Sequence, residues 1–291
     1  MNGKILNKKW FTLFLLPALT LYLIFVLLPI VWASIYSLQD WDGIGAMNFI
    51  CLQNYFKLFT DDPIFWQALV NTLVLMGISL VLIPAGLIMA IWLNTKIMLK
   101  SFFKTVIFLP LVMPSVVLGI LWAQIYNPIS GLLNSALVAF GLPHLQKAWL
   151  GEPETALLAI LVVVLWQSIG FYVIVYLAGL QNIPEEMIEA AKIDGATDSV
   201  ITLQIIIPLL SNLIKFTLIF NIITSLKYFD LVFIMTRGQP DHASEVVATH
   251  MYNQAFDLYN YGYASAIAFT LFMACVFLSF VLNRVFRRYE Y

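Results

Sequence analysis

The sequence predicts an all-α integral membrane protein with six transmembrane helices and both termini in the cytoplasm. Of its 291 residues, 62% are hydrophobic and 11% are charged, whereas soluble domains carry roughly 25% charged residues. A soluble core of this size could not bury so much apolar surface. The apolar residues also form six segments, each close to the roughly 20 residues that cross a bilayer. A net charge of −1 shows no basic excess, which argues against nucleic-acid binding.

The predicted transmembrane domain covers residues 11–285, between a cytoplasmic N-terminal segment at 1–10 and a cytoplasmic tail at 286–291. Polar connections separate the apolar segments, because unpaired backbone groups are not tolerated in the hydrocarbon core. The first segment is longer than the apolar core of a signal peptide, about 7–15 residues, so we expect it to be retained. The spans are expected at about residues 11–36, 68–93, 102–126, 155–180, 213–235 and 263–285.

The distribution of Lys and Arg predicts the orientation, because the cytoplasmic connections of membrane proteins are rich in these residues. The segments expected on one side are basic, and they include both termini. The opposite side carries mainly Lys57, Lys147 and Arg237, spread over longer connections. The basic residues that place the termini in the cytoplasm are Lys4, Lys8, Lys9, Lys96, Lys100, Lys104, Arg284, Arg287 and Arg288.

The connection at residues 181–211 departs from this charge pattern, since it is acidic although it lies on the cytoplasmic side. Pro184 suits the first turn of a helix, and the two glutamates that follow it complement the positive end of the helix dipole. Gly195 is expected to end that helix. A second short helix is expected to begin with Asp198 as its N-cap and to run into Pro208. The sequence therefore predicts two short helices joined by a glycine turn at the membrane surface.

A more specific pattern begins within the first of these helices. It consists of Glu189-Ala190-Ala191, then Gly195 after three residues, and Ile205, Ile207 and Pro208 after nine more. This pattern resembles the EAA motif of binding-protein-dependent ABC importer permeases, with Ile207 in place of the usual Leu. The resemblance implies cytoplasmic coupling helices, between spans four and five, that dock on an ATPase. The residues it assigns to ATPase coupling are Glu186, Glu189, Ala190, Ala191, Asp194, Gly195 and Pro208.

The resemblance extends over nearly the whole chain and is closest to the carbohydrate-uptake branch of that family. Residues 176–184, 229–231 and 261–264 carry it, and the overall pattern resembles the larger permease of the maltose transporter without its extra N-terminal helices and large outer domain. The resemblance implies a permease in the bacterial plasma (inner) membrane that forms the path for a mono- or oligosaccharide by alternating access. It implies as partners a second, homologous permease, two ATPase subunits and an extracytoplasmic sugar-binding protein.

The chain lacks the motifs of an enzyme. It contains no Gly-x4-Gly-Lys-Ser/Thr phosphate loop, so ATP and Mg²⁺ are expected to be used by the partner ATPases, and this chain is expected to bind no cofactor. The zinc-protease and serine-hydrolase motifs are missing as well. His242 and His250 are expected to be solvated loop residues, and Cys51 and Cys275 to be unpaired thiols without a metal.

Polar residues inside the predicted spans are candidates for the substrate path, because they are costly in a membrane. In the fifth span they recur at steps of three and four and so share one helical face. They supply the hydroxyl, amide and aromatic groups that a sugar needs, and the segment resembles the one that contacts sugar in the maltose transporter. The alternative is that they hydrogen-bond neighbouring helices. The candidates are Gln167, Ser168, Tyr172, Asn221, Thr224, Ser225 and Tyr228.

The residues alone leave two other functions possible as alternatives. One is a permease for glycerol phosphate or a polyol, although phosphate favours Arg or Lys along the path and only Lys227 is available. The other is an ion-driven secondary transporter, which calls for acidic residues in the membrane, and only Asp230 qualifies. That function also leaves the EAA-like segment unexplained. The sequence therefore favours a neutral sugar and a separate ATPase.

Overall fold

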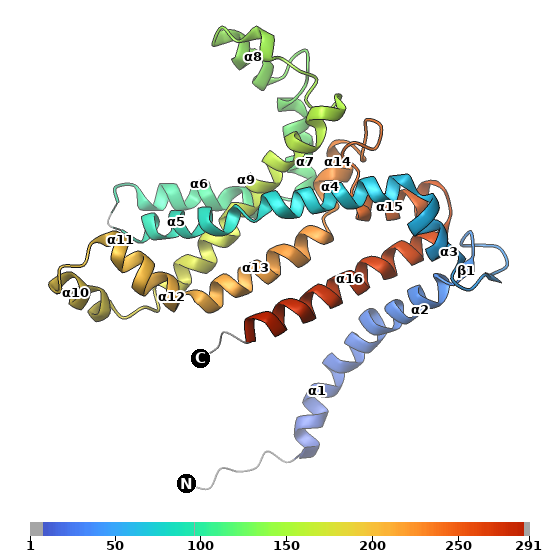
Figure 1. Cartoon of the computed structure of the whole chain (residues 1–291), viewed down its shortest axis with the longest axis horizontal. Helices are drawn as coiled ribbons and strands as arrows, with labels where there is room; N and C mark the ends of the chain where they lie inside the picture. The colour runs from blue at the N-terminus through green and yellow to red at the C-terminus, as the bar shows by residue number, and fades with distance from the viewer. Residues whose placement is uncertain (1–7, 96, 288–291) are drawn as a thin grey trace. The chain divides into compact units, whose positions relative to one another are not determined.

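The computed structural model describes residues 8–95 and 97–287, and almost all of its regular structure is helical (Figure 1). The fold divides into two compact units. One unit contains the residues up to Asp62 together with Met251–Ala274, and the other contains Pro63–His250 together with the residues from Cys275.

Parts of the predicted charge pattern lie outside the described residues. These are Lys4, Lys96 and Arg288, with most of the predicted N-terminal segment 1–10 and of the predicted tail 286–291. The placement of the termini in the cytoplasm therefore stays a prediction.

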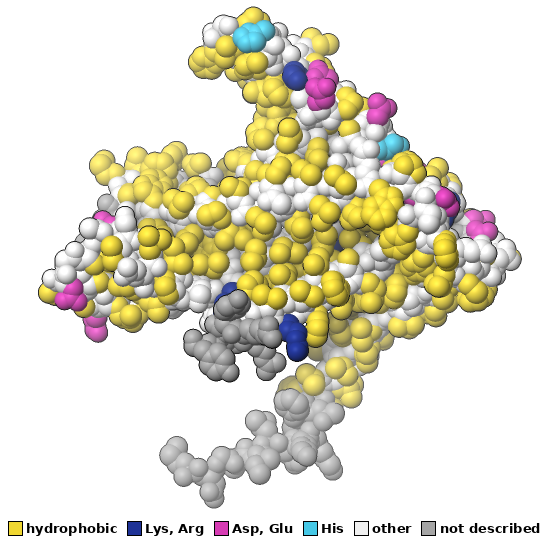
Figure 2. Space-filling model, in the orientation of Figure 1, with side chains coloured by type: hydrophobic (Ala, Val, Ile, Leu, Met, Phe, Trp, Pro, Cys, Tyr) yellow, Lys and Arg dark blue, Asp and Glu magenta, His cyan; other side chains and the backbone are white. Residues whose placement is uncertain are grey.

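Five helices among the described residues are long and apolar enough to cross a membrane, and they cover the predicted first, second, fourth, fifth and sixth spans. Large apolar side chains are exposed along them, such as Phe14 (81% exposed) and Phe277 (65% exposed). Figure 2 shows a face covered mainly by apolar side chains. Lipid is the solvent that suits such a surface. The five helices are Leu13–Tyr36, Pro63–Asn94, Pro153–Leu180, Ser211–Met235 and Tyr261–Phe286.

The third predicted span is broken, and the prediction of one helix across residues 102–126 is wrong in this respect. Helix α6 (Lys100–Val112) and helix α7 (Ser115–Ile125) are bent by 102° at the break between them. The cause is Pro114, because a residue that precedes proline avoids the helical region. Met113 accordingly has an extended backbone with ψ of 136°.

Three π-helical turns each end two residues before a proline. Proline lacks a backbone N–H, and its ring clashes with the carbonyl four residues earlier in a regular helix. A π turn inserts one extra residue and so relieves that clash. In the first and third cases the helix continues through the proline. The pairs are η1 (Leu23–Leu27) with Pro29, η2 (Lys57–Asp61) with Pro63, and η4 (Thr202–Ile206) with Pro208.

In the first unit, hydrogen bonds between distant parts of the chain hold a segment rich in loops. The buried side-chain amide of Asn54 donates to the carbonyls of Ser37 and Gln39, both at 2.9 Å. The Gly262 N–H donates to the carbonyl of Trp41 at 3.0 Å. A Cβ at position 262 would lie 2.0 Å from the Gln39 carbonyl oxygen, so only glycine fits there. Besides η1 and η2, this unit contains α1 (Lys8–Tyr22), α2 (Leu28–Tyr36), β1 (Gln39–Asp40), β2 (Asn48–Phe49), α3 (Gln53–Phe56), η5 (Asn253–Asp257) and the first part of α16 (Tyr261–Arg287).

The second unit is built around the long helix α9 (Pro153–Leu180). Before α9 in the chain come α4 (Pro63–Ser79), α5 (Leu82–Asn94), α6, α7, α8 (Leu132–Ala139) and η3 (Pro143–Leu145). After it come α10 (Glu185–Ile193), α11 (Asp198–Ile201), η4, α12 (Ile207–Leu209), α13 (Ser211–Leu226), α14 (Asp230–Met235) and the first part of α15 (Val247–Tyr252), which belongs to this unit up to His250.

Two apolar core clusters hold this second unit together along α9. One cluster joins α9 to α5 and includes Leu87, Val173 and Tyr176. The other joins the first half of α9 to α7 and α14 and includes Leu118 and Leu231. Helices α4, α6 and α13 also pack against α9. The arrangement places one face of α9 opposite α4 and α13, where the candidate path residues lie.

Candidate functional site

A cavity of about 250 Å³ lies in the second unit, where α4, α9 and α13 meet. Of the seven residues predicted for the substrate path, Gln167 does not line the cavity and is half-buried elsewhere on α9. The other six line it. The lining residues are Leu75, Ser79, Leu82, Leu111, Val164, Ser168, Phe171, Tyr172, Phe220, Asn221, Thr224, Ser225 and Tyr228.

The chemistry of this lining is polar, aromatic and uncharged. None of the described residues that line the cavity is Asp, Glu, Lys, Arg or His. The rings of Phe171 and Phe220 stack with their centroids 4.5 Å apart, and Tyr172 meets Phe171 edge-on at 5.5 Å. Hydroxyl and amide groups lie beside these rings. Such a site suits a neutral ligand with many hydroxyl groups and some apolar surface.

Ser79 is a residue of this site that the sequence analysis missed. Its hydroxyl lies 3.0 Å from Asn221 Oδ1 and 3.0 Å from Ser225 Oγ. The side-chain amide of Asn221 donates to the Ser79 carbonyl at 3.2 Å and to the Tyr172 hydroxyl at 2.7 Å. A polar residue inside an apolar span was the signal that could have found it. The predicted alternative, hydrogen bonding between helices, therefore holds for Asn221 and Ser225.

The charged residues near the fifth span lie away from the cavity. Lys227 and Asp230 are both exposed, and neither belongs to its lining. Asp230 is the first residue of α14, where a negative charge complements the helix dipole. The one acidic residue weighed for ion coupling therefore takes no part in this cavity.

The acidic connection folds into two short helices, α10 and α11, with a turn at Gly195. Gly195 has φ of +82°, a backbone conformation that favours glycine. The predicted N-cap is wrong by one residue, because Thr197 rather than Asp198 caps α11. The Thr197 hydroxyl accepts the Val200 N–H at 3.4 Å. Asp198 is instead the first residue of α11, where its charge also suits the helix dipole.

The residues predicted for ATPase coupling divide between two faces of the segment. Ala191 is half-buried and packs with Ile188 against the core cluster around α5 and α9. Two apolar residues of α10 outside the predicted set are also exposed, Met187 by 44% and Ile193 by 86%. The exposed members of the predicted set are Glu186, Glu189, Ala190, Asp194, Gly195 and Pro208. The segment thus presents an acidic surface that also carries apolar side chains.

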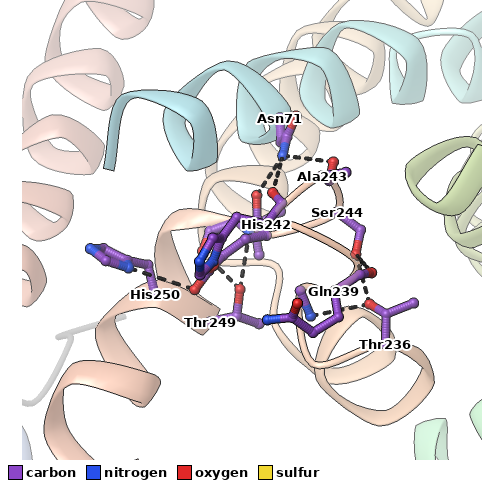
Figure 3. Close-up of polar contacts among 11 residues, drawn as sticks. Asn71, Thr236, Gln239, His242, Ala243, Ser244, Thr249 and His250 are labelled. Carbon is purple, nitrogen blue, oxygen red and sulfur yellow. Dashed lines mark hydrogen bonds and ion pairs between the residues drawn. The ribbon is translucent and has the colours of Figure 1, made fainter. Parts of the chain in front are cut away.

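The loop between α14 and α15 contains a buried carboxylate, Glu245, held between two histidines. Figure 3 shows the polar contacts around His242 and His250. Nδ1 of His242 contacts Glu245 Oε2, and Nδ1 of His250 lies 3.6 Å from Oε1. The side chain of Asn71 on α4 donates to the carbonyls of Ala243 at 3.0 Å and Glu245 at 2.8 Å. These contacts attach the loop to α4.

The prediction that both histidines are solvated is wrong for His250, which is 2% exposed. Burial opposes the charged form of Glu245, but the hydrogen bonds from His250 and His242 outweigh it and hold the pKa of this carboxyl below its usual range. Within the described residues there is no group of three or more His, Cys, Asp or Glu that could hold a metal ion. The cluster is therefore best explained as a structural support of the loop.

Comparison with known proteins identifies the family. Residues 82–291 match the family described as binding-protein-dependent transport system inner membrane component. The chain is 39% identical to the probable ABC transporter permease protein YurN of Bacillus subtilis, over 97% of both chains. It is 34% identical to the multiple sugar-binding transport system permease protein MsmF of Streptococcus mutans, over 99% of this chain and 98% of that protein.

A solved structure shares the fold. It is the crystal structure of a bacterial ABC transporter that imports the acidic polysaccharide alginate, with a TM-score of 0.85 and 24% identity over 98% of this chain and 97% of that one. The family match covers most of the sequence, and relatives above 30% identity cover nearly all of it. The chain therefore belongs to the inner membrane components of binding-protein-dependent transport systems, which are permease subunits of ABC transporters.

Proposed function

We propose that this permease forms the translocation path of an ATP-driven importer for a neutral sugar. The observation that carries the proposal is the uncharged cavity between α4, α9 and α13, with its stacked phenylalanines and hydroxyl groups. The Streptococcus mutans relative is named for the transport of multiple sugars, which supports the same class of substrate.

The size of the cavity limits the ligand. At about 250 Å³ it lies just below the usual range of roughly 300–1,000 Å³ for small-molecule pockets. It therefore has room for a monosaccharide or for one end of an oligosaccharide. Aromatic rings offer apolar surface to the faces of a sugar ring, while Ser168, Thr224 and Tyr228 offer hydrogen bonds to its hydroxyl groups.

Energy enters through a separate ATPase. The exposed acidic surface of α10, with Glu186 and Glu189, docks on that subunit at the cytoplasmic face, and both termini of the chain lie on the same side. Helix α12 ends at Leu209, and α13, which lines the cavity, begins at Ser211. A movement of α10 is thereby passed along the chain to the substrate path, so that ATP binding and hydrolysis drive alternating access.

The full importer contains this chain, a second homologous permease, two ATPase subunits and an extracytoplasmic sugar-binding protein. ATP and Mg²⁺ are bound by the ATPases. The permease itself carries out no covalent chemistry.

The alternatives differ from this proposal in their charge requirements. A phosphate-bearing substrate calls for a cation beside the path, and Lys227 is exposed and outside the cavity lining. A polyol has no charge and fits the same lining, so a panel of solutes must separate it from a sugar. An ion-driven transporter calls for an ionisable site in the path, whereas the described lining contains none among Asp, Glu, Lys, Arg and His.

The experiment is ATP hydrolysis by the complex purified through a tag on this chain and placed in lipid vesicles with its binding protein. Sugars, polyols and glycerol phosphate are added one at a time. We expect one sugar to stimulate hydrolysis, and Glu189→Lys on α10 to abolish the stimulation. Glu154→Lys, an equal charge reversal at an exposed position in the first turn of α9, is the matched control and is expected to keep it. The proposal would be contradicted if no ATPase purified together with this chain, or if Glu189→Lys left the sugar-stimulated hydrolysis intact.

A further inference from the structure

The second span, Pro63–Asn94, is interrupted near its middle, next to the cavity, by a two-residue turn. Helix α4 ends at Ser79 and α5 begins at Leu82. Pro84 has no backbone N–H to donate to the carbonyl of Leu80, four residues back. The N–H of Ile83 donates to that carbonyl at 3.2 Å, three residues back. In a regular helix that N–H would reach the carbonyl of Ser79, four residues back. The break therefore frees the Ser79 carbonyl inside a span.

Asn221 of α13 satisfies that free carbonyl. Its side-chain Nδ2 lies 3.2 Å from the Ser79 oxygen, although the two residues are 142 positions apart in the chain. Helix breaks in membrane spans are tolerated where a neighbouring helix satisfies the freed backbone groups. Leaving a buried polar group unpaired costs about 1–3 kcal/mol, so this bond stabilises the packing of the second span on α13.

The same contact fixes the orientation of the Asn221 amide. If the amide were turned over, its oxygen would face the Ser79 carbonyl oxygen, and two acceptors would repel each other. With the orientation set, the two Nδ2 hydrogens go to the Ser79 carbonyl and to the Tyr172 hydroxyl, and Oδ1 faces the Ser79 hydroxyl at 3.0 Å. Asn221 is 2% exposed. Its amide hydrogens are fully used inside the protein, so none is left for a sugar.

This arrangement limits where the hydroxyl hydrogen of Tyr172 can point. Because Asn221 donates to its hydroxyl oxygen at 2.7 Å, the hydroxyl hydrogen must point in another direction. Within the described residues no protein group accepts that hydrogen. Tyr172 lines the cavity, so the hydrogen is available to an acceptor placed there.

We infer that Asn221 is a positioning residue that acts through Tyr172, and that the Tyr172 hydroxyl, not the Asn221 amide, donates a hydrogen bond to the transported sugar. This inference rests on the proposed sugar transport through the cavity. It assigns Asn221 the role of joining α4, α9 and α13, and it adds Ser79 to the groups that set the geometry of the site.

The test is a double-mutant cycle on the half-saturating sugar concentration for stimulated ATP hydrolysis. Tyr172→Phe removes the hydroxyl that donates to the sugar and that accepts from Asn221, and Asn221→Leu removes the group that orients it at similar side-chain size. Each single variant is expected to raise the half-saturating concentration roughly three- to tenfold, the range for one lost hydrogen bond. The double variant is expected to be no worse than the worse single variant, because both remove the same bond.

Ser168→Ala is the control, since Ser168 lines the cavity but has no contact with Asn221 among the hydrogen bonds described. Its effect is expected to multiply with that of Tyr172→Phe. If Asn221→Leu does not assemble, Asn221→Ser replaces it, because a serine is too short to reach Tyr172 and still carries one donor.

The possible results distinguish a failure of this inference from a failure of the proposed sugar transport. Multiplicative effects of the position 221 and position 172 variants would show that Asn221 contacts the sugar itself and would overturn the inference. An unchanged half-saturating concentration in Tyr172→Phe would overturn it as well. A wild-type complex whose hydrolysis responds to no sugar would instead refute the proposed function.

Discussion

Replacing Gly86 by alanine tests whether the close contact between α5 and α9 shapes the cavity. A Cβ at position 86 would lie 2.5 Å from the Cβ of Tyr172 and 3.3 Å from its backbone carbon. Backbone atoms cannot swing aside as a side chain does. The two helices must therefore move apart by about 0.9 Å to reach the 3.4 Å at which ordinary contact begins, and Tyr172 must move with α9.

The energetic cost follows from this geometry. Overpacking of a dense contact costs about 1–3 kcal/mol, and the better helix propensity of alanine offsets about 0.8–1.0 kcal/mol. Gly77→Ala on α4 is the matched control, because nothing lies within 4 Å of a Cβ at that position. It makes the same change of residue in a helix of the same span, so it shows the propensity effect alone.

The assay is the thermal unfolding midpoint of the purified complex, followed by the half-saturating sugar concentration. We expect Gly86→Ala to unfold roughly 2–12 °C below Gly77→Ala, at about 2–4 °C for each kcal/mol, and to need more sugar because Tyr172 is displaced. Equal midpoints and equal sugar dependence for the two variants would refute the argument from close packing.

Three further predictions concern the coupling turn, the outer loop and the first unit. Gly195→Ala places a side chain in a left-handed conformation, at a cost of about 1–2 kcal/mol, and is expected to reduce sugar-stimulated hydrolysis. Gly195→Asn, which adopts that conformation more readily, should lose less. Because the pKa of Glu245 is lowered in the folded protein, its stabilising contribution is present above the ordinary value of 4.5 and is lost as the pH falls below it. The unfolding midpoint of the wild type should therefore fall on acidification more steeply than that of Glu245→Gln. Gly262→Ala would bring a Cβ within 2.0 Å of the Gln39 carbonyl, and is expected to expose residues 39–50 to limited proteolysis while Gly77→Ala does not.

Much of the fold was predictable because the determining property is local. A run of about 20 apolar residues must cross the bilayer whatever its neighbours are, and the long helices accordingly fall on the predicted spans. The helix-glycine-helix form of the acidic segment was predictable for the same reason, although Pro184 is the N-cap of α10 and not a residue of its first turn. The bend at Pro114 could also have been predicted from the sequence. It was not, because the apolar run at residues 102–126 is long enough to be taken for one straight helix.

What the sequence could not supply is the set of partners for each polar side chain. Asn221 was predicted as a sugar contact from its helical face, yet its amide is taken up by a carbonyl that Pro84 frees on another helix. His250 was expected in solvent, yet it packs beside Glu245. The sequence by itself determined that the chain spans a membrane and where it forms the acidic helix-glycine-helix segment, because hydrophobic length and turn chemistry belong to single segments. Only the tertiary structure decided which polar groups face the cavity, because a hydrogen bond depends on which helices meet, and those helices are far apart in the chain.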